Sequence, residues 1–267
     1  MRVLLGGVAF VLAAVLVVLV AALWARVAPR ERDVAWVAGA GIVPDDEAEV
    51  VRRYLARHRR LRMAGGLVGV VATTVAAFRY QGSVSFTALL FGGIAGVLVG
   101  TLFAESYRLG PRGGAAAVAS LEPRDPAPLP GVVWTARGLL AAATLGAVAL
   151  SLWVRDTATV LLAVAGLLVA GLAEATRARI VGRRRPVLSF RARELDARIR
   201  AFAGRSVANL QLAAALLVVT GVVASVPAPG PVPTALRWLV WLVGLVLAWV
   251  YTHRAAPRPP SSWRQPT

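Results

Sequence analysis

Residues 91 to 108 read FGGIAGVLVGTLFAESYR, and we expect this stretch to decide how the chain folds. Gly92, Gly96, Gly100 and Ala104 fall four residues apart, so on a helix they form one smooth ridge. Such a ridge lets the backbone of a neighbouring helix come close. Packing against another helix of the same chain is the simpler interpretation. A surface for self-association or for lining a pore is the alternative.

The motif that ends this stretch, Ala-Glu-x-x-Arg, occurs twice. Glu105 precedes Arg108 by three residues, and Glu174, 69 positions later, precedes Arg177 by three. The two carboxylates could converge near one membrane face and take a proton, a cation or a basic partner. Alternatively, each neutralises a nearby arginine in a contact worth about 0 to 1 kcal/mol. We favour the second interpretation, because a carboxylate at the membrane edge costs little. Glu105 and Glu174 remain the candidate functional carboxylates.

The composition predicts an integral membrane protein. The chain is 58% hydrophobic with a mean hydropathy of +0.67, and it contains several apolar runs long enough to cross a bilayer. We expect an all-α bundle, one amino-terminal helix plus three hairpins, forming a single domain over 1–253 with a disordered tail over 254–267. The seven predicted spans cover about 3–25, 63–78, 84–105, 133–154, 157–175, 207–226 and 235–252. Arg62, Arg137 and Arg205 stand at the start of the three hairpins, which favours an internal repeat.

The arginines predict how the spans are threaded. All thirty basic residues are arginine, and seven spans place 26 of them on one side of the membrane and four on the other. By the positive-inside rule the basic side is cytoplasmic, the amino terminus lies outside and the carboxyl terminus inside. The absence of lysine is typical of a GC-rich coding sequence, so we expect a bacterial cell membrane. Because topology accounts for the net charge of +17, no nucleic-acid partner is expected.

Two polar segments on the basic side have helical patterns. The first starts at Pro44 with acidic residues in its first turn, and we expect it to run along the membrane surface or straight into the next span. The second, from Ser189 to about 206, carries an apolar stripe and predicts an interfacial amphipathic helix. The proline-rich linker 226–233 is expected to be non-helical. Anionic lipid headgroups are the expected contacts of five arginines near the second segment: Arg183, Arg184, Arg185, Arg191 and Arg193.

The sequence carries no signature of a reaction. It has no cysteine, and its two histidines, His58 and His253, lie among arginines, which disfavours a metal ion. Nucleotide-binding and hydrolase motifs are absent, so we predict no catalytic, cofactor-binding or metal-binding residues. No ionisable residue falls at mid-span, which argues against an ion-coupled pump. We expect a non-enzymatic assembly or scaffold component. The alternative is a transporter or permease subunit that depends on a partner for energy, and a membrane-embedded lipid-modifying enzyme is a more distant one.

Overall fold

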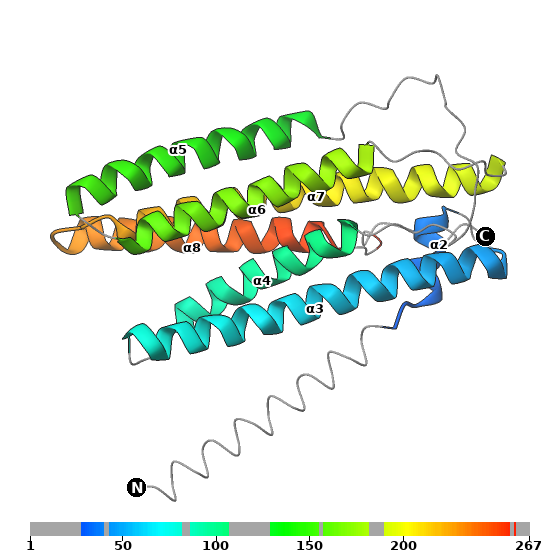
Figure 1. Cartoon of the computed structure of the whole chain (residues 1–267), viewed down its shortest axis with the longest axis horizontal. Coiled ribbons are helices and arrows are strands. Elements are labelled where there is room, and N and C mark those ends of the chain that lie inside the picture. Colours follow the sequence, from blue (N-terminus) through cyan, green and yellow to red (C-terminus); the bar gives the residue numbers. More distant parts are fainter. Residues whose placement is uncertain are drawn as a thin grey trace, which may run out of the picture.

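The described part of the chain is entirely helical. The computed structural model describes residues 28–39, 43–81, 86–106, 129–154, 157–181, 190–256 and 259. Six of its helices lie side by side in an elongated bundle, and the short α2 lies at one end of it (Figure 1). The seven described helices are α2 (Glu31–Ala38), α3 (Asp45–Gln81), α4 (Phe86–Ser106), α5 (Pro130–Val154), α6 (Thr157–Val181), α7 (Phe190–Ser225) and α8 (Pro231–Arg254).

The predicted spans correspond to helices wherever the chain is described. Five helices, α3, α5, α6, α7 and α8, are long and apolar enough to cross a membrane. Helix α4 is apolar too, but the part of it whose side chains are described, Leu89–Glu105, is shorter. The first predicted span, 3–25, and most of the tail lie outside the described residues. The described part of the chain is therefore helical, and its five long apolar helices indicate a membrane-embedded protein.

Local sequence explains where the helices begin. In α3, acidic residues fill the first turn directly after Pro44, where carboxylates face the positive end of the helix dipole. Helix α8 begins at Pro231, so the prediction that the linker is non-helical through 233 is wrong for its last three residues. Proline is tolerated there because the first-turn N–H groups have no partner within the helix. The preceding Gly230 has a φ of 92°, which favours glycine.

Helices α3 and α7 are each continuous where the sequence suggested two parts. The acidic-start segment after Pro44 runs straight into the second predicted span as one helix of 37 residues. The segment from 190 joins the sixth predicted span in a helix of 36 residues. A separate interfacial helix over 189–206 is therefore not confirmed. No proline interrupts the junction near residue 206, and Gly204 lies within the continuous helix, so the helix does not stop there.

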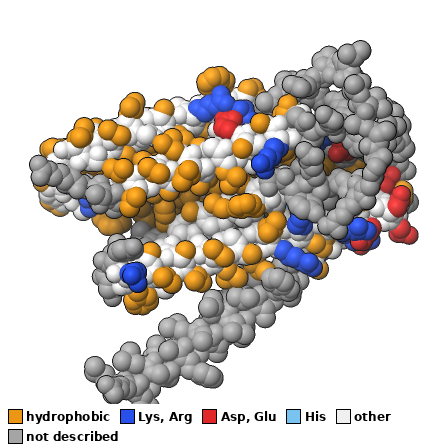
Figure 2. Space-filling model, viewed as in Figure 1, with side chains coloured by type: hydrophobic (Ala, Val, Ile, Leu, Met, Phe, Trp, Pro, Cys, Tyr) orange, Lys and Arg blue, Asp and Glu red, His pale blue; other side chains and the backbone are white. Residues whose placement is uncertain are grey.

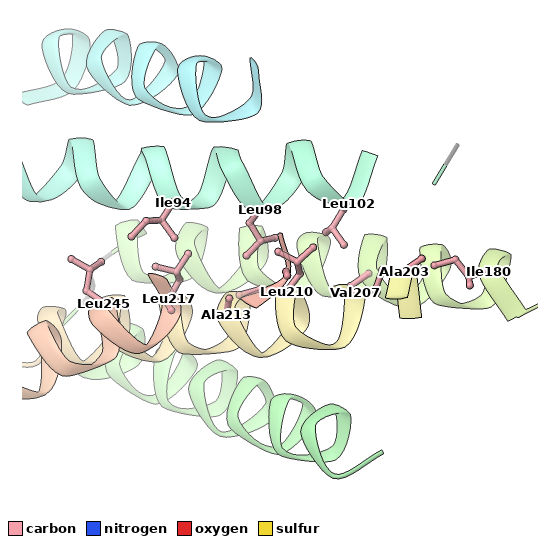
Figure 3. Close-up of a cluster of buried hydrophobic side chains, with 14 residues drawn as sticks. Ile94, Leu98, Leu102, Ile180, Ala203, Val207, Leu210, Ala213, Leu217 and Leu245 are labelled. Atoms are coloured by element: carbon pink, nitrogen blue, oxygen red, sulfur yellow. The ribbon is translucent and has the colours of Figure 1, made fainter. Parts of the chain in front are cut away.

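Helix α7 is the centre of the bundle. In its most apolar stretch 67% of the residues are buried, against 6% for α3. Alanines along α7, including Ala213, Ala214 and Ala215, let its neighbours pack closely. One face of α7 meets Ile94, Leu98 and Leu102 of α4 (Figure 3). Other faces of α7 contribute to a second core with α5 and α6.

Helices α3 and α4 form a hairpin joined through glycines. A Cβ added at Gly96 would lie 2.2 Å from the carbonyl oxygen of Gly65, and one at Gly92 would lie 1.9 Å from Thr73 Oγ1. Likewise, a Cβ at Gly69 would lie 2.1 Å from the oxygen of Gly92. Real side chains do not tolerate such contacts, so only glycine allows the two backbones to approach this closely. The ridge of α4 is thus occupied by a helix of the same chain.

The surface of the bundle is apolar along its sides and more charged toward one end. Hydrophobic side chains cover the flanks of the bundle, and most of the visible charged side chains lie toward the end where α2 lies (Figure 2). Tryptophans mark both ends of α5, where Trp134 is 68% and Trp153 is 74% exposed. Exposed tryptophans at the two ends of an apolar helix are typical of membrane–water interfaces.

Candidate functional site

The helices at the basic end pack around a small apolar core of their own, and we call this end of the bundle the cap. It consists of α2 and the amino-terminal halves of α3 and α7, which extend past the other helices (Figure 1). Its core is apolar and contains Val34, Val51, Leu55 and Ile199. The apolar stripe on the first half of α7 therefore packs against α2 and α3. The cap also contains four aromatic rings in edge or tilted contact: Trp36, Tyr54, His58 and Phe202.

Glu105 is buried where the cap meets the hairpin. Only 2% of its side chain is exposed, and its Oε1 accepts a hydrogen bond of 2.9 Å from the hydroxyl of Tyr54. Nε2 of His58 lies 3.1 Å from the same oxygen. A buried carboxylate requires such polar neighbours, because its desolvation is costly. The expectation that Glu105 makes only a surface-grade contact is therefore not met, and Arg108 lies outside the described residues.

His58 is the most enclosed polar residue of this group. Its side chain is fully buried, with its ring centroid 6.4 Å from that of Phe202. The Nε2–Oε1 distance is within ion-pair range, yet within the described part of the chain neither ring nitrogen meets the geometry of a hydrogen bond. The contact between His58 and Glu105 is therefore a close approach without a directed hydrogen bond. Tyr54 provides the directed one.

Two arginines of α3 bond to the segments next to Tyr54, His58 and Glu105. Arg57 Nη2 donates a hydrogen bond of 2.9 Å to the carbonyl oxygen of Ala104, the residue before Glu105. Arg59 Nη2 lies 2.5 Å from Asp33 of α2, and its Nη1 donates to the carbonyl oxygen of Ala28 at 2.9 Å. One face of α3 thus holds the end of α4, and another holds α2 and the segment before it.

Glu174 is the centre of a separate polar network. Its Oε1 accepts hydrogen bonds from Arg137 Nε of α5 at 2.9 Å and from Gln211 Nε2 of α7 at 2.8 Å. Its Oε2 accepts a hydrogen bond from Arg177, three residues later in α6. Arg137 also stacks on Trp134, with its guanidinium 4.9 Å from the ring centre. The network joins three helices near the basic end of the bundle.

The structure therefore gives the two copies of Ala-Glu-x-x-Arg different surroundings. Glu174 pairs with the arginine of its own motif and with a second arginine, as the simpler interpretation expected. Glu105 is buried and has the phenol of Tyr54 and the imidazole of His58 among its neighbours. The sequence singled out Glu105 but missed Tyr54 and His58. Their spacing was a usable signal, because His58 follows Tyr54 by four residues and Val51 by seven, which places all three on one helix face.

The other predicted contact residues divide between described and undescribed segments. Ala104 is fully buried, and the glycines of its ridge lie against α3. Three of the arginines expected to contact lipid, Arg183, Arg184 and Arg185, lie outside the described residues. Arg191 and Arg193 lie in the first turns of α7, where the backbone is described and the side chains are not.

The described side chains define little chemistry. No cluster of three or more histidine, aspartate or glutamate residues that could hold a metal ion occurs within the described ranges. Tyr54, His58 and Glu105 are groups able to exchange a proton, but their geometry mainly joins α3 to α4. In comparisons with known proteins, the chain matches no family model, no curated protein and no solved structure.

Proposed function

We propose that the chain is a non-enzymatic membrane protein that assembles with, or scaffolds, another membrane component through its basic end. The observation that carries this proposal is the cap. It has its own apolar core and is joined to the bundle by continuous helices and by the Glu105 contact. Its surface presents charges of both signs, such as Glu49 and Arg53, with exposed side-chain fractions of 48% and 71%. A charged surface next to a membrane suits recognition by a protein partner of complementary charge.

We further propose that the chain lies in a bacterial cell membrane with the cap in the cytoplasm. The amino terminus would then lie outside and the carboxyl terminus inside, as the distribution of arginines favours. Anionic headgroups would contact Arg183, Arg184, Arg185, Arg191 and Arg193 on the same side. Arg137, stacked on the exposed Trp134, has the position of an interfacial anchor.

The interior of the bundle weighs against a transport role. Four threonines inside it bond to their own helices: Thr101, Thr144, Thr176 and Thr220 each donate to the carbonyl oxygen four residues earlier. The rest of the described interior is built mainly from alanine, leucine and valine. A transported solute usually needs polar groups near mid-membrane, within discontinuous helices. The permease alternative therefore has less support than the assembly role.

A photo-cross-linking experiment tests the assembly role. A benzophenone amino acid replaces Arg53 or Arg60, both exposed on the cap, in the full chain expressed in its native membrane. A matched control carries the same group at Leu161, which is 69% exposed on the flank of α6. Irradiation is expected to give a discrete cross-linked product of defined mass from the cap positions. The Leu161 control should give no such product, because its side chain faces lipid.

Two outcomes would contradict the proposal. One is the same pattern of products from the cap and the control positions, which would indicate random collision. The other is solute flux through liposomes that contain the purified chain alone, since an assembly component without a transport path should leave the liposomes sealed.

A further inference from the structure

Two arginines share one carboxylate on the flank of the bundle. Oε1 of Glu174 lies 2.8 Å from Nη2 of Arg137 in α5, and Oε2 of Glu174 pairs with Arg177, three residues later in α6. All three side chains are partly exposed, by 37% for Arg137, 22% for Arg177 and 32% for Glu174. Two positive charges thus meet one negative charge. The cluster, which we call the arginine pair, has one positive charge in excess.

The helices around the arginine pair supply no further negative charge. Glu174 is the sole acidic residue of α5, α6 and α8. Helix α7 contributes Gln211 to the network, and its two acidic residues, Glu194 and Asp196, pair with arginines of their own helix. Within these four helices the excess charge of the arginine pair is therefore not balanced.

Part of each guanidinium is also left without a protein acceptor. Arg137 directs Nε and Nη2 toward Glu174, and Arg177 directs Nη2. Among the described residues, Nη1 of Arg137 and both Nε and Nη1 of Arg177 have no acceptor. The ring of Trp134, 4.9 Å from the Arg137 guanidinium, supports it from one side. Planar guanidinium groups held in this way match the oxygens of a phosphate group, to which they can donate two hydrogen bonds at once.

The arginine pair lies at the edge of the predicted hydrocarbon layer. The exposed Trp134 and Trp153 are nineteen positions apart on α5. This separation corresponds to about 28 Å along the helix, close to the thickness of about 30 Å expected for the hydrocarbon core. Arg137 follows Trp134 by three residues, so its backbone lies about one turn inside this edge. An excess charge at this depth is costly unless the side chain reaches a headgroup of opposite charge.

The described protein leaves room for a lipid beside the arginine pair. An added Cβ at Gly138, the residue after Arg137, or at Gly171, one turn before Glu174, would have no atom within 4 Å. Farther along the two helices, Leu145 is 71% and Leu168 is 70% exposed. Hydrophobic side chains continue along the flanks of the bundle (Figure 2). A molecule with a charged head and apolar chains suits this combination of a basic edge and an apolar flank.

We propose that the arginine pair binds the phosphate group of an anionic phospholipid. One phosphate can bridge both arginines, because both already reach the two oxygens of a single carboxylate. Its oxygens accept from the N–H groups that Glu174 does not use, and its negative charge balances the excess charge. A zwitterionic lipid binds less well, because its ammonium group restores the excess. The site requires the bundle to lie in a membrane, but it depends neither on a partner of the cap nor on which side of the membrane is cytoplasmic.

Native mass spectrometry of the full chain tests the site. The protein is purified in detergent, stripped of lipid and titrated with phosphatidylglycerol, and the lipids that remain bound during collisional activation are counted. Arg177→Gln should retain one lipid fewer than the parent chain. The matched control is Arg179→Gln, which removes the same charge from an exposed position two residues away and should retain as many lipids as the parent. Circular dichroism before lipid addition checks that each variant is folded.

Two further arms identify the source of the phosphate. With phosphatidylcholine of the same acyl chains, the parent and Arg177→Gln should retain equal numbers of lipids. Glycerol 3-phosphate, a soluble phosphate without acyl chains, should not displace the additional phosphatidylglycerol from the parent. Displacement by glycerol 3-phosphate would overturn the assignment to a lipid. Equal lipid loss from Arg177→Gln and Arg179→Gln, or loss from neither, would overturn the site itself.

A conservative variant keeps the proposal testable if Arg177→Gln does not fold. Arg177→Lys retains the positive charge beside Glu174 but lacks the planar group that donates two hydrogen bonds. It should release the additional phosphatidylglycerol at a lower activation energy than the parent does. Unchanged retention by Arg177→Lys would overturn the proposed contact. Cap cross-linking at Arg53 should be the same in these variants as in the parent, so the outcome for the lipid site is separate from that for the assembly role.

Discussion

Nε2 of His58 lies 3.1 Å from Oε1 of Glu105, and both side chains are shielded from solvent. His58 belongs to the part of α3 that lies in the cap, whereas Glu105 is near the end of α4. The contact therefore fixes the far end of the glycine-packed hairpin to the cap. It stands at the position where α3 changes from an amphipathic helix to an apolar one.

Replacing Glu105 with alanine is expected to destabilise the fold by about 3 kcal/mol. The substitution removes the acceptor of the Tyr54 hydroxyl and the carboxylate that lies beside the buried ring of His58. For a chain of this size the apparent Tm in detergent should fall by about 6 to 12 °C. Glu49→Ala is the matched control, because Glu49 forms an exposed ion pair with Arg53, and it should change stability by less than about 0.5 kcal/mol.

The conservative variant separates hydrogen bonding from charge. Glu105→Gln keeps an oxygen that accepts from Tyr54 and removes the negative charge next to His58. Its loss of stability should be clearly smaller than that of Glu105→Ala if the hydrogen bond dominates. Equal losses from the two variants would show that the charge is what the buried site requires. Thermal unfolding followed by circular dichroism compares both variants with the parent chain.

Replacing Gly96 with leucine is expected to disrupt the hairpin. Even a single added carbon at this position would lie 2.2 Å from the carbonyl oxygen of Gly65, so the two helices must move apart. We expect a loss of at least about 2 kcal/mol and a lower yield of folded protein. Gly171→Leu is the control, since a Cβ there has no atom within 4 Å. Size-exclusion chromatography in detergent completes the test. A folded Gly96→Leu protein whose only change is oligomer size would contradict the packing role and favour the self-association alternative.

The Glu174 network predicts a measurable coupling between two helices. A double-mutant cycle uses Glu174→Ala, Arg137→Ala and the double variant. Because Arg137 donates to Glu174 in a half-buried site, the coupling energy should be about 1 kcal/mol, with the ion pair stabilising. Unfolding midpoints in mixed detergent micelles supply the three free-energy differences. Losses that simply add would show that the contact contributes no net stability.

Sequence patterns located the helices well, because a bilayer leaves few alternatives to long apolar helices. The four-residue glycine spacing in the stretch around Gly96 pointed to a close helix pair, and α3 presents Gly65 and Gly69 against it. The sequence left open whether the helical segment after Pro44 lies along the membrane surface or runs straight into the second predicted span. Only the observed helix shows that it continues straight through residue 62.

The candidate site was predictable only in part. Glu105 and Glu174 stand in the same local motif, so sequence alone assigned them the same role. Their difference arises from long-range packing: α3 brings Tyr54 and His58 against the first, whereas α5 and α7 give the second an arginine and an amide. The pairing of Tyr54 with Glu105 spans 51 positions of the chain, a contact that no local pattern encodes. The arginines around His58 were used only to argue against a metal ion, and the sequence gave no sign that the histidine side chain is buried.

The threading of the spans gives a prediction that labelling can check. Helices α3, α5 and α7 start at the cap end, so the linker that contains Ala228 lies at the opposite end of the bundle from Glu49 (Figure 1). If the basic end is cytoplasmic, a membrane-impermeant maleimide added to intact cells should label Ala228→Cys. It should label Glu49→Cys only after the membrane is permeabilised. Both positions are solvent-exposed or partly so, and the cysteine-free parent chain provides the blank. The reverse pattern of labelling would place the cap outside the cell. It would then rule out cytoplasmic proteins as the partners that dock on the cap.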